Sequence, residues 1–396
     1  MKYIIVNSVK GGCGKSSISL RTAIELAMAT KEIEVKNKKT GKKEKKKIYA
    51  NNVLVIDMDI LGSSLRTFVT GELFKQELND KTTSNKWTKK DLIIGTKANL
   101  KQEAYWLLQD EHAPQEEQDK GDPICFSDIF CKKYEDYKSK RIETPFRVCP
   151  CLEKNEEDDA DLPLVHIAFS SENQTVKNRF RAQKSNNYTP NVNVRYYEEV
   201  LRKYIKYLGE KALSNGKPAT HIIFDMPPNS DPYSDCVFSL LLKKIKDGIQ
   251  NKVVDKKRDT VELRVVSSCD LSHIGANLLW MENIFDKNGW QYALPNEISF
   301  IINDITGATS VEGAKDVRVA MLKKVGIALR WTVFDTIAKK ILWHDRDDVL
   351  ILSSACKSCV AFSRKPFVDC STELEKIREQ AESNDGTQPS FRNDDN

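Results

Sequence analysis

The stretch KGGCGKSS, residues 10–17, decides the fold of this chain. The apolar run Tyr3–Val6 before it predicts a buried strand, and residues 18–30 after it predict a helix with one apolar face. A strand, a glycine-rich loop and a helix in this order form a phosphate-binding site, because loop N–H groups and the helix N-terminus point at one anion. A chance glycine-rich turn is the alternative, and the order of these three segments argues against it.

The residues expected to surround the phosphates are those of the loop. They are Lys10, Gly11, Gly12, Cys13, Gly14, Lys15, Ser16 and Ser17. In such a loop the second lysine, Lys15, reaches the β- and γ-phosphates, and the Ser16 hydroxyl ligates Mg²⁺. The usual loop of this kind begins with glycine where this chain has Val9, and it has no lysine at the position of Lys10.

With Lys10 included, the loop resembles the deviant Walker A sequence KGGxGK[ST] of the ParA/MinD family of ATPases. In that family the first lysine reaches the nucleotide of the partner subunit in an ATP-bound dimer. The resemblance implies this role for Lys10, and it implies ATP and Mg²⁺ as cofactors. The residues alone show a second cation beside the phosphate loop.

Composition narrows the class of protein. The chain has 396 residues, of which 40% are hydrophobic and 30% charged, as expected for a soluble protein with a real core. No apolar run is long enough to cross a bilayer, and the N-terminus enters a predicted core strand without a signal peptide. We therefore expect a cytoplasmic protein whose ten cysteines are mostly reduced.

The positive charge is concentrated in one segment. Residues 31–50 hold nine lysines and three glutamates, a net charge of +6, so the rest of the chain carries −1 of the total +5. Alternation in Glu32–Val35, a Thr40-Gly41 turn and the return through Lys47–Tyr49 predict a β-hairpin. ParA relatives usually need only a few residues here, so the resemblance marks the segment as an insertion.

This basic hairpin is a candidate for non-specific DNA binding, with a solvated surface loop as the alternative. The lysines expected to contact DNA are Lys42, Lys43, Lys45, Lys46 and Lys47.

Two further strands end in carboxylates. Val53–Ile56 is followed by Asp57 and Asp59, and the tips of parallel strands are where open α/β sheets bind ligands. The segment resembles the family's Walker A′ segment, in which Asp59 matches the aspartate that positions the attacking water. Asp57 is expected to serve Mg²⁺. An aspartate turn that caps the next helix is the alternative.

The run His221–Phe224, which ends in Asp225 and two prolines, predicts a Walker B strand. It matches the family pattern of an apolar run followed by D-x-P-P. Asp225 is expected to hold Mg²⁺ through a water molecule.

Strands are also predicted at Leu164–Phe169, Leu263–Ser268 and Ile298–Asn303, and a helix over residues 194–213. Asn303 falls where the family hydrogen-bonds adenine. The residues after Asn303 lack the N/T-K-x-D pattern of related GTPases, which favours ATP. Alternatively, Asn303 simply ends its strand.

Residues 67–160 are atypical for the family and are predicted to be an insertion specific to this protein's partner. Their cysteines are Cys125, Cys131, Cys149 and Cys151, whose spacings do not match a paired zinc motif. Buried or incidental thiols are expected instead.

Near the C-terminus, Cys356 and Cys359 form a C-x₂-C that is a plausible half-site for zinc or an iron–sulfur cluster. Residues 371–396 are polar and are predicted to be a disordered tail. They do not form a basic amphipathic helix, so no membrane anchor of the MinD kind is expected.

Together these segments predict a doubly wound, mostly parallel α/β sheet in a single domain over residues 1–370. The resemblance implies a slow ATPase that acts as an ATP-dependent homodimer in DNA partition or intracellular positioning, stimulated by a protein adaptor, with no membrane partner. Two alternatives stay open. One is an Mrp-type metal carrier that uses Cys356 and Cys359, and the other is a bacterial tyrosine kinase, which shares the Walker motifs.

Overall fold

The structure is a computed structural model. It describes residues 1–36, 41–62, 65, 105–106, 141–142, 146–150, 165–170, 178, 195, 197–205, 218–228, 232–242, 259–285, 292–304, 318–320, 322–323, 340–344, 350–354, 359–362 and 367–385. Most of the predicted insertion 67–160 lies outside these residues. So do Cys125, Cys131, Cys151, Cys356 and residues 386–396.

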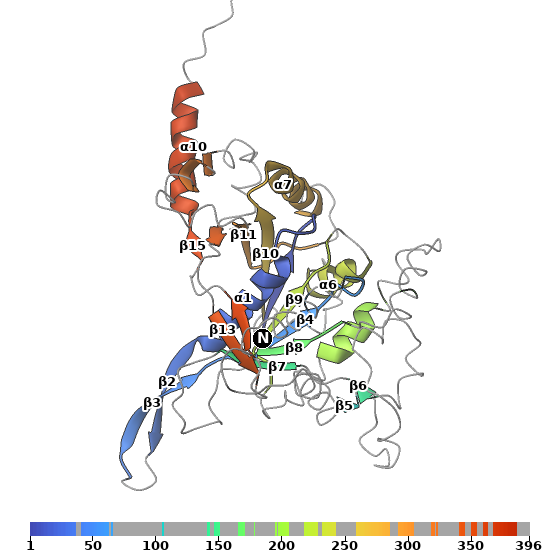
Figure 1. Ribbon diagram of the computed structural model, residues 1–396, viewed down its shortest axis with the longest axis vertical. Coiled ribbons are helices and arrows are strands. Elements are labelled where there is room, and N and C mark those ends of the chain that lie inside the picture. Colours follow the sequence, from blue (N-terminus) through green and yellow to red (C-terminus); the bar gives the residue numbers. More distant parts are fainter. Residues whose placement is uncertain are drawn as a thin grey trace, which may run out of the picture.

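An 11-stranded sheet forms the centre of the described structure, in the order β14-β13-β7-β8-β4-β9-β1-β10-β11-β12-β15 (Figure 1). The strands from β8 to β12 in this order run parallel. They are β8 (Val165–Ala168), β4 (Val53–Asp57), β9 (His221–Asp225), β1 (Lys2–Asn7), β10 (Thr260–Ser268), β11 (Glu297–Asn303) and β12 (Lys340–His344). The predicted mostly parallel α/β sheet is therefore confirmed.

Antiparallel strands complete both ends of this sheet. They are β7 (Phe146–Pro150), β13 (Leu350–Ser354) and β14 (Cys359–Phe362) at one end, and β15 (Val368–Asp369) at the other. The short strands β5 (Tyr105–Trp106) and β6 (Arg141–Ile142) pair only with each other. Cys149 lies in β7 and Cys359 begins β14, so the metal half-site proposed from the sequence is described at one of its two cysteines only.

The parallel strands are apolar on both faces because helices cover both faces. On one face, Ile4 of β1 and Val55 of β4 pack in one cluster with Ile18 and Ile24 of α1 (Lys15–Met28).

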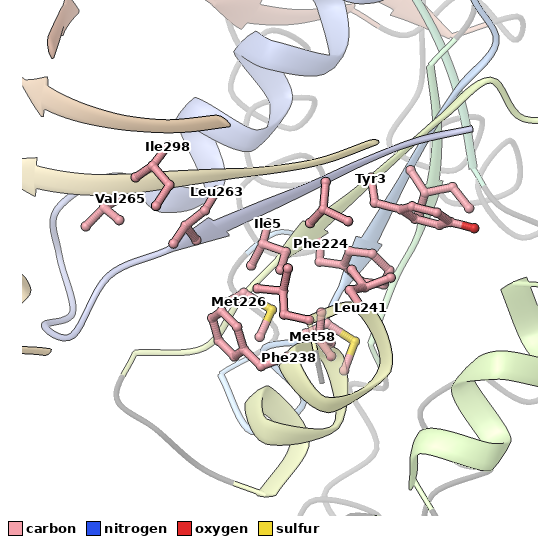
Figure 2. Packing of buried hydrophobic residues seen from close by; sticks show 14 of the residues in the cluster. Tyr3, Ile5, Met58, Phe224, Met226, Phe238, Leu241, Leu263, Val265 and Ile298 are labelled. Atoms are coloured by element: carbon pink, nitrogen blue, oxygen red, sulfur yellow. The ribbon is translucent and has the colours of Figure 1, made fainter. Parts of the chain in front are cut away.

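On the other face, the neighbouring residues Ile5 and Phe224 contact the cluster that includes Phe238 and Leu241 of α6 (Pro232–Leu242). Figure 2 shows these side chains together beneath the strands. Helix α7 (Leu271–Phe285) and the helical residues 197–205 add to the same cluster. Successive residues of β1 thus pack alternately in the cluster that includes α1 and in the cluster that includes α6.

The predicted basic hairpin is present as β2 (Thr30–Lys36) and β3 (Lys43–Tyr49), a separate two-stranded sheet. In Figure 1 it extends away from the body of the molecule. The register places Lys43, Lys45 and Lys47 on one face and Lys46 on the other.

Two lysines of the first face form ion pairs within the hairpin. Lys43 lies 3.0 Å from Glu34, and Lys45 lies 3.7 Å from Glu32. The five lysines predicted to bind DNA therefore do not form one continuous basic surface, and DNA binding stays a prediction.

The prediction of a disordered tail over residues 371–396 is wrong for its first part. Residues Ser371–Asp385 form α10. Asp369 accepts hydrogen bonds from the N–H and the hydroxyl of Ser371, which stabilises the start of the helix. Leu374 is buried in the main core and Ile377 packs against it. These anchoring contacts outweigh the polar composition of the rest of the helix. Among the described residues, no helix is long and apolar enough to span a membrane.

Candidate nucleotide-binding site

The glycine-rich loop joins β1 to α1 at the edge of the sheet where the parallel strands end. Gly12 and Gly14 adopt left-handed backbone angles, with φ of 78° and 85°. This alternation turns successive N–H groups toward one side and forms an anion-binding concavity at the start of α1. The Cys13 side chain is fully buried in the core, so only its backbone is available to a ligand.

Gly14 is required for a second reason. A Cβ atom at this position would lie 2.1 Å from Nδ2 of Asn303, closer than atoms can approach. Asn303 uses that nitrogen to donate a hydrogen bond of 2.9 Å to the carbonyl oxygen of Cys13. The end of β11 therefore packs directly against the loop, as close as a glycine allows.

The two lysines of the loop occupy different environments. Lys15 is the first residue of α1 and is 8% exposed. Lys10 lies nearer the surface, where its Nζ donates a hydrogen bond of 2.9 Å to the Ser272 hydroxyl in the first turn of α7. Lys15 is thus placed to contact an anion bound by its own loop, whereas Lys10 lies at the outer rim of that loop.

Three buried carboxylates, Asp57, Asp59 and Asp225, lie at the tips of the neighbouring strands β4 and β9. Asp57 accepts hydrogen bonds from the Asp59 N–H at 3.1 Å and from the Ser170 hydroxyl at 2.7 Å, so both of its oxygens are engaged. This geometry supports a role for Asp57 in holding the turn after β4. Its predicted role at Mg²⁺ stays a prediction.

Asp59 accepts a hydrogen bond of 2.9 Å from the N–H of Gly62. A Cβ atom at Gly62 would come within 2.2 Å of the Asp59 carboxylate, so any other residue there would displace this carboxylate. The tight turn leaves Asp59 only 8% exposed at the strand tip.

Asp225 is the carboxylate best suited to serve a cation. Ser19 donates a hydrogen bond of 2.8 Å to its Oδ1, and the Ser16 hydroxyl also bonds to the carboxylate. Its other oxygen, Oδ2, is buried and has no hydrogen-bond partner within the part of the chain that the structure describes.

Burial raises the pKa of Asp225 to about 6, although the serine hydroxyls and Lys15 oppose this shift. Burial, and then the charge of Asp225, raise the pKa of Asp57 well above its usual value. Buried carboxylates with raised pKa values favour a nearby cation. Within the described ranges, no three His, Cys, Asp or Glu side chains converge as direct metal ligands. The site therefore fits Mg²⁺ held by Ser16, by phosphate oxygens and by water bound to Asp225.

Replacing Asp225 with asparagine is expected to stabilise the nucleotide-free protein near neutral pH. The raised pKa means that burial favours the protonated form, so this group's contribution is present below pH 3.8 and is lost as the pH rises through about 6. A shift of about two units corresponds to about 3 kcal/mol, which neutral asparagine removes at pH 7. Thermal melts at pH 5 and pH 7.5 measure this gain, which is expected to be larger at the higher pH.

The exposed Asp270, whose pKa is lowered rather than raised by its hydrogen bonds to Ser272, gives the matched control Asp270→Asn. That variant is expected to gain no stability at pH 7.5. A lower melting temperature of Asp225→Asn at pH 7.5 would contradict the assignment of a costly buried charge. Asp225→Asn is also expected to bind ATP with a weaker dependence on Mg²⁺, because the charge that faces the metal-bound water is removed.

A pocket of about 310 Å³ opens beside the loop. It is lined by Gly11, Gly12, Ser268, Cys269, Asp270, His273 and Asp304. The last five come from the end of β10, the start of α7 and the end of β11, and none of them was predicted as a site residue. The sequence does carry an indication of these residues. Short polar runs follow the apolar strands β10 and β11, and ligands bind at the ends of such strands.

Three residues that no sequence motif predicted hold the predicted site residues in place. They are Ser19, Ser170 and His344. Asn303, predicted to contact adenine, is buried against the phosphate loop. Its contact with adenine stays a prediction.

No protein-family model and no curated protein matches the sequence. The septum site-determining protein MinD of Pyrococcus horikoshii OT3, solved with Mg-ADP, is 14% identical over 87% of this chain and 82% of its own, with a TM-score of 0.35. A putative plasmid partition protein of Borrelia burgdorferi B31, solved with AMPPNP, is 13% identical over 97% of this chain and 98% of its own, with a TM-score of 0.37.

The ParA protein of pNOB8 is 12% identical over 84% of this chain and 78% of its own, with a TM-score of 0.38. Likenesses at this level carry no argument about function. The fold follows from the strand order and from the position of the loop. The chain is a doubly wound, mostly parallel α/β protein with its glycine-rich P-loop between β1 and α1.

Proposed function

We propose that this chain is a Mg²⁺-dependent ATPase of the ParA/MinD type, which switches between a monomer and an ATP-bound homodimer. The observation that supports it best is the separation of the two loop lysines. Lys15 is buried at the helix N-terminus, whereas Lys10 lies at the rim beside Ser272. A cation at the rim is suited to reach a nucleotide held by a second copy of the chain, as the resemblance implies.

Each site residue then has one task. Lys15 and the loop N–H groups bind the β- and γ-phosphates, because hydrogen bonds to a charged phosphate are stronger than those between neutral groups. Ser16 would ligate Mg²⁺, and Asp225 would hold it through a water molecule. Mg²⁺ supplies neutralisation of the phosphate charge. Asp59, fixed by the Gly62 N–H, accepts a hydrogen bond from the attacking water and orients it toward the γ-phosphate.

The biological role that fits such a switch is positioning of a cargo, either DNA or a protein assembly. Hydrolysis is expected to be slow until a protein adaptor stimulates it. The exposed hairpin is the natural place to look for such a partner, because it carries most of the chain's excess positive charge.

The substitution Lys10→Ala tests the switch. The variant is expected to bind ATP with nearly wild-type affinity but to stay monomeric, because Lys10 lies outside its own phosphate cradle. Size-exclusion chromatography with light scattering, without nucleotide and with Mg-ATP, measures the change. Lys31→Ala, which removes a lysine from the hairpin far along the chain from the loop, is the matched control and is expected to dimerise. An ATP-bound dimer of Lys10→Ala equal to wild type would contradict the role of Lys10.

A further inference from the structure

Three buried residues connect the end of β12 to the phosphate loop. His344, the last residue of β12, lies with its Nδ1 2.9 Å from Oδ1 of Asn303, the last residue of β11. Asn303 in turn donates from Nδ2 to the carbonyl oxygen of Cys13, also at 2.9 Å. All three residues are at most 5% exposed. The contact between the strand tips and the loop is therefore shielded from solvent and specific in its geometry.

The chemistry of the groups fixes the direction of these hydrogen bonds. A carbonyl oxygen only accepts, so the Asn303 atom that faces Cys13 must be its NH₂ group. The Asn303 oxygen then faces His344, and Nδ1 of His344 must carry the proton. A histidine that donates here prevents the asparagine amide from turning over, because the reversed amide would place NH₂ against N–H and oxygen against oxygen.

The held carbonyl sets the orientation of the next N–H group of the loop. Across a planar trans peptide the C=O and the following N–H point in opposite directions. Anchoring the Cys13 oxygen on Asn303 therefore turns the Gly14 N–H away from Asn303. Gly12 and Gly14, the residues on either side of Cys13, adopt the left-handed conformation, so the anchor stabilises the backbone shape that forms the anion-binding concavity.

We propose that His344 is a positioning residue for the phosphate loop, acting through Asn303 to hold the Cys13–Gly14 peptide in the phosphate-binding orientation. This inference rests on the proposed function only in that the loop binds the phosphates of a nucleotide. It assigns to Asn303 a task on the phosphate side of the ligand, separate from the adenine contact that the sequence predicts. It also gives His344 a task without any contact to the ligand.

The test compares two ligands, Mg-ATP and Mg-tripolyphosphate, which has no base. Each displaces a fluorescent ATP analogue from wild type, His344→Phe, His344→Asn and Asn303→Asp. His344→Phe keeps a ring beside Phe367, whose centroid lies 5.4 Å from that of His344, but it lacks the donor. His344→Asn carries an N–H donor at the same distance from Cβ as Nδ1. Loss of a buried hydrogen bond is expected to weaken both ligands by the same factor, on the order of tenfold, in His344→Phe and Asn303→Asp.

His344→Asn is expected to recover most of this loss, which a role in packing alone does not explain. Melting temperatures confirm that each variant folds, and His344→Leu replaces His344→Phe if the latter does not.

Unchanged tripolyphosphate affinity in the folded His344→Phe or His344→Leu variant overturns the proposal. An Asn303→Asp variant that loses affinity for ATP alone overturns it too, because the asparagine then acts on the base. Wild-type protein that binds neither ligand overturns the proposed function as well, whereas wild-type binding with no effect of the variants overturns this inference alone.

Discussion

Replacing Lys15 with alanine is expected to lower the affinity for ATP about 100-fold, the largest effect on binding at any single position. Lys15 is the buried cation at the N-terminus of α1, whereas Lys10, the other lysine of the loop, lies at its rim beside Ser272. Charge-assisted hydrogen bonds to phosphate contribute roughly 1.5–3 kcal/mol each, and a lysine that bridges two phosphates forms more than one. Titration calorimetry with a non-hydrolysable ATP analogue and Mg²⁺ measures the loss.

The matched control lies in the same loop. Lys10→Ala also removes one positive charge within five residues, yet it is expected to retain the affinity of the monomer for the analogue. A general electrostatic attraction of ATP to the loop would weaken both variants equally. Equal loss in the two variants would therefore count against the division of tasks between the lysines.

Replacing Asp59 with alanine is expected to reduce ATP hydrolysis by at least about 100-fold while ATP still binds. A positioned side chain that accepts a proton from the reacting group contributes typically about 10²–10⁴-fold to the rate. Asp59 lies at the tip of β4, where its carboxylate is held by the Gly62 N–H. With hydrolysis blocked, the ATP-bound dimer is expected to accumulate. Phosphate release under single-turnover conditions and light scattering of the same sample measure the two effects.

The isosteric variant Asp59→Asn separates charge from shape. It keeps an oxygen for the Gly62 N–H, so it is expected to fold as wild type does. Because it lacks the charge, it is expected to hydrolyse ATP slowly, as Asp59→Ala does. Normal turnover in Asp59→Ala would remove this residue from the mechanism. A variant that hydrolyses slowly because it binds ATP weakly is recognised by titration with the non-hydrolysable analogue.

The parts of the fold that follow from local sequence are those with strong short-range patterns. The apolar runs that become β1, β4, β9 and β11 end at polar residues, and each predicted strand is present with a boundary shift of a few residues at most. The Gly-Lys-Ser turn between β1 and α1 also needs no information from elsewhere in the chain. For these elements the periodicity of buried residues and the conformational freedom of glycine are sufficient.

What the sequence does not predict depends on contacts between distant segments. Asn303 and Cys13 are 290 residues apart, and only the strand order brings them together. Likewise, α10 is a helix although its composition is polar, because Leu374 docks on a core formed elsewhere. Strand β12 escaped notice since its apolar run Ile341–Trp343 is only three residues long. The burial that raises the pKa of Asp225 depends in the same way on the whole assembly.

The two ends of the hairpin lie close together, which makes this position tolerant of insertion and deletion. The Ala50 N–H donates a hydrogen bond of 2.9 Å to the carbonyl oxygen of Ala29, so the polypeptide leaves and rejoins the domain at nearly the same point. A segment attached in this way can be gained, lost or exchanged in one genetic event without altering the path from α1 to β4. The same junction is suited to protein engineering, since a reporter domain with closely spaced termini can be grafted there in place of the hairpin.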